Sequence, residues 1–278
     1  MVAYLHQDAR DDESLQAATQ KAVDILFQIS EQVKLNENQV GIAYNVDDLI
    51  YLKNAGKKAI FLAIENGYAI GKDLNNLSMF KDMGITYITL CHNGSNDICD
   101  SAKGEPEHDG LSPFGREVVK EMNRLGIIID ISHTSAKTVQ DVLELSTAPI
   151  IASHSSARAL CDHPRNLTDD QIRAIAAKGG VVQVCLYNWF LSKQPNPTIL
   201  DAVAHINHIV RLVGIDHVGI GTDFDGVVAS NFARSCDPTQ QVQRFIPGRL
   251  LHRENLRLLT KGCWRQRRLW RMSARNFF

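Results

Sequence analysis

Two histidines stand at equivalent points of neighbouring segments and could act on one ligand. The apolar runs 127–129 and 149–152 each lead through a short polar step to a histidine, His133 and His154. Their separation fits a strand, a crossover helix and the next parallel strand, so both imidazoles are expected at the carboxyl ends of adjacent strands. Structural histidines with hydrogen-bonded rings are one interpretation. Two in register on neighbouring strands favour the other, a shared metal ion.

A carboxylate follows another buried strand and completes a possible ligand set. The apolar run 59–64 ends in Glu65, whose charge needs a cation to face, either a lysine or a metal. Together with His133 and His154, Glu65 offers one carboxylate and two imidazoles. This donor set suits zinc with open positions for water, and such a metal lowers the pKa of the water and polarises a carbonyl.

Three further polar residues could serve hydrolysis of an amide bond. Asp223, after the strand predicted at 217–220, could take a proton from the attacking water and pass it to a leaving amine. His92, after the strand predicted at 86–91, could donate to an oxyanion, and Arg165 could bind a substrate carboxylate through two hydrogen bonds. Structural roles are the alternatives: a helix cap for Asp223, a backbone hydrogen bond for His92, and an ion pair with Asp162 or Asp169 for Arg165.

The elements that must position these residues alternate between strand and helix. Apolar runs predict strands at 3–5, 59–64, 86–91, 127–129, 149–152, 181–186 and 217–220, and periodic patterns predict helices at 12–34, 46–54, 74–83, 112–125, 169–178 and 200–213. The polar stretch 95–110 is long enough for a functional lid. Because polar residues recur at each strand exit, we predict a single α/β domain over residues 1–278, a (β/α)₈ TIM barrel rather than a doubly wound sheet.

Composition excludes several classes of partner. The chain of 278 residues is 44% hydrophobic and 22% charged with a net charge of −1, which predicts no nucleic-acid partner. No apolar run has the length of a membrane span and the first residues have no signal-peptide core, so we expect a soluble protein. Its compartment stays open: cytoplasmic as written, extracytoplasmic if the true N-terminus lies upstream. The six cysteines have no C-x-x-C spacing and do not demand disulfides, and Cys185, inside an apolar strand run, is expected to be a buried free thiol.

The motifs resemble those of the membrane (renal-type) dipeptidases, peptidase family M19. The similar strings are AIENGYAIG, LCHNGSND, GLSPFGREVVKEMNRLGIIIDISHTS, APIIASHSSARALCDHPRNL and GTDFDG, in order over about residues 3–226. The resemblance implies a TIM barrel of the metal-dependent hydrolase type with two zinc ions. It also implies hydrolysis of dipeptides, including those with a C-terminal D-residue, and a possible homodimer. It gives Glu65 a role bridging the zincs and implies roles for five others: His133 and His154 as ligands of one zinc, His92 and Arg165 as substrate contacts, and Asp223 as acid/base.

One departure from the family pattern lies at the N-terminus. The family carries a His-x-Asp pair after its first strand, which supplies ligands of the other zinc, whereas the segment preceding His6 and Asp8 is similar to the family's second strand. We therefore expect that the first strand is missing, that one zinc site is complete and that the second is half built.

The other departure lies at the C-terminus. Residues 1–237 are similar to the family pattern, whereas residues 238–278 are not. The tail is rich in arginine with Glu254 as the one acid from 244 to 275, and its last residues are similar to the family's closing Gly-Asn-Phe. A solvated basic helix, a nucleic-acid tail and a product of a shifted reading frame are the interpretations, and the sequence favours the last.

Three functions compete on these motifs. The first is a zinc-dependent dipeptidase. The second is a catalytically inactive remnant that at most binds metal or peptide. The third is another metal-dependent hydrolase such as an amidohydrolase-type lactonase, against which the DFDG and HSSAR strings speak.

Overall fold

A computed structural model describes residues 1–223 of the chain. The chain divides into two compact units, the first formed by Met1–Ile151 and the second beginning at Ala152. The prediction of a single barrel domain stays a prediction, and the tail 238–278 with its three interpretations lies outside the described residues.

The first unit is built on parallel strands whose carboxyl ends are in register. Its strands follow the order β1 (Val2–Tyr4), β4 (Leu62–Glu65), β5 (Ile85–Thr89), β6 (Ile128–Asp130) and β7 (Ile151–Ala152), the last at the boundary between the units. Tyr4 pairs with Glu65, Glu65 with Thr89, and Thr89 with Asp130. Whatever follows these residues along the chain therefore emerges at one edge of the sheet, as expected for parallel strands.

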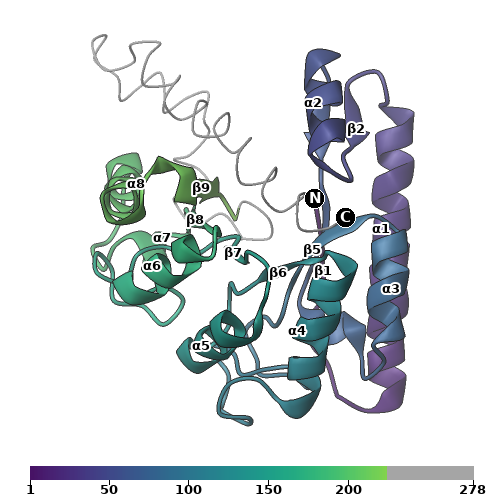
Figure 1. The fold of residues 1–278 in the computed structure, drawn as a ribbon, viewed down its shortest axis with the longest axis horizontal. Helices are drawn as coiled ribbons and strands as arrows, with labels where there is room; N and C mark the ends of the chain where they lie inside the picture. The colour runs from purple at the N-terminus through teal and green to yellow at the C-terminus, as the bar shows by residue number, and fades with distance from the viewer. Residues whose placement is uncertain (224–278) are drawn as a thin grey trace. The chain divides into compact units, whose positions relative to one another are not determined.

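Helices cover these strands, and their ends are set by local sequence. α1 (Asp12–Leu35), α3 (Asn75–Asp82), α4 (Pro113–Leu125) and α5 (Ala136–Leu145) connect the strands, and Figure 1 shows α1, α3 and α4 outside them. α4 begins at the predicted Ser112-Pro113 pair, where Ser112 Oγ accepts from the N–H of Gly115, and it ends at Gly126 with φ of 66°. None of the helices within residues 1–223 has the length and apolar character needed to cross a membrane.

The predicted strand 59–64 is two strands in different sheets. β3 (Lys58–Ile60) pairs with β2 (Val40–Ile42), which follows α1, and the helix α2 (Val46–Asn54) joins the two. Only β4, after Phe61, enters the main sheet, and it then runs into the short 3₁₀ helix η1 (Gly67–Ile70). A continuous apolar run cannot show such a division, because both strands are rich in the same residue types.

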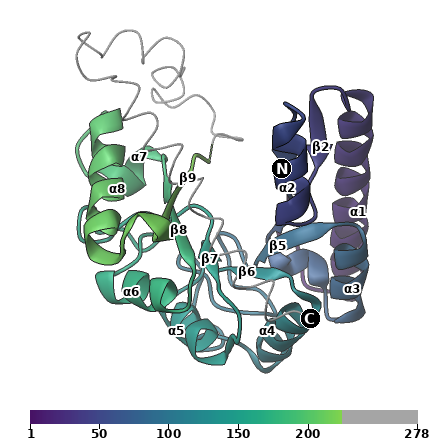
Figure 2. The same ribbon diagram turned by 45° about the horizontal axis from the view of Figure 1, so that its top comes forward.

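The second unit carries its own parallel strand pair. β8 (Val181–Cys185) pairs with β9 (Val218–Gly221), and α6 (Asp169–Ala177), α7 (Asn188–Leu191), α8 (Ile199–Val213) and the 3₁₀ helix η2 (Ile215–His217) complete the unit (Figure 2). Thr168 caps α6, as predicted, in a capping box with Gln171. Cys185 at the end of β8 is a buried free thiol, like the other three cysteines of the described residues.

The loop 95–110, predicted as a lid, is fastened to the first unit by the buried carboxylate of Asp100. This carboxylate accepts the N–H groups of Glu107 (2.7 Å), His108 (3.1 Å) and Gly110 (2.9 Å). The Asp100 main chain also accepts the N–H of Ser135, the N-cap of α5, at 2.9 Å. One side chain therefore orders the loop against the segment that follows β6.

Replacing Asp100 with Asn is expected to lower the free energy of unfolding by about 3 kcal/mol, because an amide NH₂ then meets backbone N–H groups. Burial raises the pKa of Asp100, but the N–H donors outweigh it and hold the pKa below its ordinary value. The stabilisation is therefore complete above the ordinary carboxyl pKa of about 4 and is lost as pH falls through the folded-state value. Urea unfolding at pH 7 and at lower pH measures both effects.

The matched control is Asp170→Asn, which changes an exposed aspartate and is expected to cost about 0.5 kcal/mol or less. An Asp100→Asn variant as stable as this control at pH 7 would contradict the role given to the carboxylate.

Candidate metal centre

Glu65 is a buried carboxylate at the end of β4. It is 8% exposed, and its strand neighbours Ala63 and Ile64 are fully buried. One carboxylate oxygen, Oε1, lies 3.2 Å from Nε2 of His133. An ionised carboxylate in such surroundings needs a partner, and the His133 imidazole is one group that faces it.

His133 stands three residues beyond β6 in a strained turn. Its φ is 70°, a left-handed conformation that costs about 1–3 kcal/mol for a residue other than glycine. Hydrogen bonds on both sides hold the turn: the carbonyl of His133 accepts from the N–H of Ala102 at 2.7 Å, and the N–H of Thr134 donates to Ile131 at 3.2 Å. The backbone thereby aims the imidazole back toward the exit of β4.

The other ring nitrogen of His133 determines the tautomer. Nδ1 lies 3.2 Å from Oδ1 of Asn93, and an amide oxygen can only accept, so Nδ1 carries a proton. Nε2 then faces the Glu65 carboxylate with either a second proton or a lone pair. In the neutral ring with the proton on Nδ1, Nε2 carries the lone pair that a metal ion needs.

His92 follows β5 and stacks on the same pair. Its ring centroid lies 4.2 Å from that of His133 and 4.8 Å from that of Tyr4, the last residue of β1. Oη of Tyr4 lies 3.5 Å from Nδ1 of His92. The exits of β1, β4, β5 and β6 thus bring Tyr4, Glu65, His92 and His133 together in the first unit.

His154 and Arg165 lie in the second unit and contact each other. Both are buried, and Nδ1 of His154 lies 2.7 Å from Oγ of Ser153. The Arg165 guanidinium donates to the carbonyl of His154 at 3.2 Å and to Oγ of Ser155 at 3.3 Å, and it lies 5.2 Å from the centre of the Phe190 ring. In the segment that follows β7, the main chain at His154 is therefore held by the buried guanidinium of Arg165.

The two acids considered as partners of Arg165, Asp162 and Asp169, each have another basic side chain beside them. Asp169 accepts from the ring of His208 at 2.7 Å, and Asp162 lies 3.8 Å from Nζ of Lys193.

Asp223, the last described residue, follows β9 with a left-handed φ of 57°. Its carboxylate accepts from the thiol of Cys185 at 3.6 Å. Burial, reinforced by the negative charge of Asp223, raises the pKa of the Cys185 thiol well above its ordinary value, so the thiol keeps its proton and donates. The cap role considered for Asp223 concerns residues outside those described.

Backbone strain gathers at the strand exits. Of the described residues other than glycine, five have a positive φ, and three of them directly follow strands or lie just beyond: Asn66 (84°), His133 (70°) and Asp223 (57°). Strained non-glycine residues cluster where function requires a fixed geometry, so this distribution supports a functional site at these exits.

The His6 and Asp8 pair has a different environment. Both side chains are largely exposed, at 70% and 75%, with Nε2 and Oδ1 4.0 Å apart. Such exposure is typical of a solvated pair.

Sequence reasoning missed the amide and carboxylate residues that support the site. Asn93 fixes the tautomer of His133, Asn66 and Asn96 cross-link strand exits, and Asp130 is a fully buried carboxylate that accepts from Thr89 Oγ1 at 2.6 Å. The one signal in the sequence was position, because each lies within a few residues of a predicted strand exit.

The donors present fit a divalent metal ion. Glu65, His133 and His154 are buried and offer a carboxylate oxygen and two imidazole nitrogens. This is a borderline-hard donor set of the kind that holds zinc and related metals while leaving positions for water.

Solved structures of known proteins resemble this fold. The probable dipeptidase PvdM from Pseudomonas aeruginosa aligns with a TM-score of 0.73 at 29% identity, over 77% of this chain and 69% of that one. A metallo peptidase from Rhodobacter sphaeroides, solved with a phosphinate mimic of the dipeptide L-Ala-D-Ala, aligns with a TM-score of 0.72 at 24% identity, over 81% and 72%. The prediction of an α/β fold of the barrel type is confirmed by these neighbours.

Relatives by sequence are named as dipeptidases. Dipeptidase tcpJ of Claviceps purpurea is 38% identical over 211 residues, which are 75% of this chain and 49% of that protein. The uncharacterized dipeptidase C965.12 of Schizosaccharomyces pombe is 38% identical over 230 residues, 81% of this chain and 55% of that protein. The chain thus spans about half the length of the curated relatives it matches.

The family resemblance inferred from the motifs is confirmed by a family model. The model described as membrane dipeptidase (peptidase family M19) matches residues 1–253. This chain therefore belongs to the membrane dipeptidase family, peptidase family M19.

Proposed function

We propose that this chain is a zinc-dependent dipeptidase that hydrolyses the peptide bond of dipeptides. The observation that carries the proposal is the buried contact between Glu65 and Nε2 of His133, with Nδ1 of that ring held by Asn93. A histidine held through one nitrogen while the other faces a carboxylate is the arrangement of a metal ligand with its supporting partner. Membership of the M19 family and the relatives named as dipeptidases give the reaction class.

Glu65, His133 and His154 are the proposed ligands of one zinc ion. All three side chains are buried, and they combine one negative charge with two neutral donors. Both histidines engage Nδ1 with a neighbouring oxygen, Asn93 for His133 and Ser153 for His154, and Nε2 is the nitrogen that each would offer to the metal under this proposal. When bound, the zinc supplies acidification of water and polarisation of the scissile carbonyl.

Asp223 is the proposed acid/base of the reaction. Its carboxylate takes the proton that the attacking water gives up and delivers it to the nitrogen of the leaving amine. The Cys185 thiol, which keeps its proton, donates to this carboxylate and would help to orient it.

Arg165 and His92 are the proposed substrate contacts. The guanidinium suits the terminal carboxylate of a dipeptide. His92, whose Nδ1 lies 3.5 Å from Oη of Tyr4, would donate to the developing oxyanion of the substrate.

Three finer features belong to the same proposal. A C-terminal D-residue is accepted, as the resemblance implies. Glu65 has a second oxygen for another zinc, which needs ligands besides the three named here. A homodimer stays a prediction.

Replacing Glu65 with Gln is expected to reduce bound zinc from about one ion per chain to near zero, because the amide removes the one negative charge among the proposed ligands. The measurement is zinc per chain by elemental analysis after dialysis against a weak chelator.

Glu117→Gln is the matched control, because Glu117 is an exposed glutamate paired with Lys120, and it should keep the wild-type zinc content. Unchanged zinc in Glu65→Gln would refute the ligand role. Near two ions in the wild type would mean that further ligands, such as His6 and Asp8, complete a second site.

Asp223→Asn is expected to lower kcat on Gly-D-Ala by about 10²–10⁴-fold with zinc content unchanged, because the amide cannot carry the proton. Steady-state hydrolysis of Gly-D-Ala and Gly-L-Ala by the zinc-loaded full chain measures the effect, with Asp170→Asn as the matched control. A zinc-loaded wild type that turns over neither dipeptide would overturn the proposal and leave an inactive metal-binding chain.

A further inference from the structure

Asn66, the residue directly after Glu65, is buried in a conformation that asparagine rarely adopts. It is fully buried, with φ of 84° and ψ of 100°. Positive φ favours glycine, which has no Cβ to clash with the backbone. An asparagine in this place must therefore be held by contacts that glycine cannot make.

The side chain of Asn66 makes three such contacts. Nδ2 donates to the carbonyl of Leu5 at 3.0 Å, just past the end of β1. Oδ1 accepts from the N–H of Tyr68 at 3.2 Å and from Nδ2 of Asn96 at 3.2 Å. Both ends of the amide are thus used, and the exit of β4 is tied to the exit of β1.

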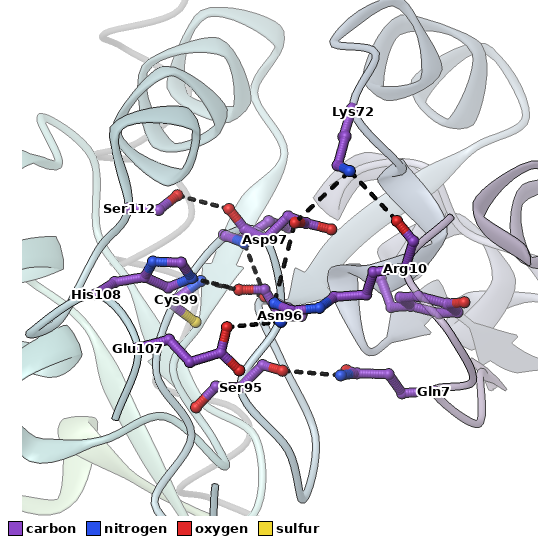
Figure 3. A network of polar contacts seen from close by, with 12 residues as sticks. Gln7, Arg10, Lys72, Ser95, Asn96, Asp97, Cys99, Glu107, His108 and Ser112 are labelled. Atoms are coloured by element: carbon purple, nitrogen blue, oxygen red, sulfur yellow. Dashed lines mark hydrogen bonds and ion pairs between the residues drawn. The ribbon is translucent and has the colours of Figure 1, made fainter. Parts of the chain in front are cut away.

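Asn96 extends this link to β5 and to the loop 95–110. Its Nδ2 also donates to the carbonyl of Leu90, one residue beyond β5, at 2.9 Å. Its Oδ1 accepts the N–H groups of Ile98 (2.9 Å) and Cys99 (3.1 Å), and its carbonyl lies 2.8 Å from Nε2 of His108. Figure 3 shows Asn96 at the centre of these contacts, with His108 and Cys99 around it.

A second ring of contacts lies outside the two amides and closer to solvent. Arg10 pairs with Glu107 at 2.7 Å, Lys72 lies 4.0 Å from Asp97, and Gln7 donates to the carbonyl of Ser95 at 2.8 Å (Figure 3). These contacts join the same segments, but their charged side chains are a quarter to a half exposed. Solvent screens such pairs, so the buried amides carry the alignment.

We propose that Asn66, held by Asn96, is a positioning residue for the metal ligand Glu65. The side-chain bonds of Asn66 fix the peptide that follows Glu65 and thereby the direction from which its carboxylate meets Nε2 of His133, 3.2 Å away. Because Asn66 contacts neither the proposed metal nor substrate, it acts through Glu65. The inference rests on the proposed function, since it assigns Glu65 to the metal.

Asn66→Gly tests the proposal, because glycine adopts the backbone conformation without strain but removes the three side-chain bonds. The zinc dissociation constant is expected to rise about 10–100-fold, the usual effect of losing a residue that supports a metal ligand. Competition for Zn²⁺ with a fluorescent chelator measures the constant. The d–d absorption of the Co²⁺-substituted protein reports whether the ligand geometry has changed.

Asn196→Gly is the matched control. Asn196 also has a positive φ, of 60°, but is exposed in the second unit. This variant should keep the wild-type zinc affinity and Co²⁺ spectrum. Its melting temperature, measured alongside that of Asn66→Gly, separates a general loss of stability from a change at the metal.

Asn96→Ala provides a second variant in case Asn66→Gly does not fold. It removes the bond to Asn66 but keeps the bonds of Asn66 to Leu5 and Tyr68, so a smaller rise in the same constant is expected. In the double variant the two effects should be less than additive, because they share one hydrogen bond.

Wild-type zinc affinity and an unchanged Co²⁺ spectrum in folded Asn66→Gly, or in folded Asn96→Ala where the first variant does not fold, would overturn the inference. A wild-type chain that binds no zinc would instead overturn the proposed function, so the two failures are distinguishable.

Discussion

The constraint on which the rest of the first unit depends is the burial of the Glu65 carboxylate at the end of an apolar strand. Ala63 and Ile64 place it in surroundings where an unpaired charge costs several kcal/mol. One group that faces the carboxylate is the His133 imidazole, with Nε2 3.2 Å from Oε1, and His133 adopts a left-handed backbone conformation there. Register among β4, β5 and β6 is therefore a requirement of the site as well as of the fold, since a shift of one residue would turn Glu65 to the other face of the sheet.

Magnitudes indicate which contacts keep this arrangement in place. The pair between Arg10 and Glu107 has both side chains about one third exposed, and such pairs contribute about 0–1 kcal/mol. A buried amide or carboxylate is different. Its removal leaves buried donors and acceptors without hydrogen bonds, and each such group lowers the stability of the fold by about 1–3 kcal/mol. Asn66 and Asp100 are buried and each satisfies several main-chain groups. The order of the strand exits thus depends more on a few interior polar side chains than on the ion pairs above them.

The sequence predicts those parts of the molecule whose causes are local. The predicted helices 12–34 and 112–125 match α1 and α4 within a residue or two, because their caps lie in the sequence itself. The strand 59–64 was predicted wrongly as one piece, because β2, the partner of its first half, lies about 20 residues away and has no distinct pattern. For the candidate site, residue type and position predicted Glu65, His92 and His133, and the structure places these three side chains together. The supporting amides were not found, because an asparagine near a turn has many local uses and only tertiary contacts reveal which one applies.

The partners of the two histidines bear on the kind of metal site that the proposed ligands can form. Asn93 gives His133 an amide oxygen, and Ser153 gives His154 a hydroxyl, and both of these partners at Nδ1 are neutral. A carboxylate behind a ligating histidine raises the basicity of the ring and adds negative charge near the metal. With neutral partners, Glu65 alone supplies negative charge among the three ligands. If these three residues hold zinc as proposed, the ion would keep most of its positive charge, which would favour acidification of water over tight structural binding. Because Glu65 is the one negatively charged residue among the three proposed ligands, metal affinity is expected to depend most on the position of its carboxylate. It should therefore also depend on the buried amides that hold the backbone after Glu65.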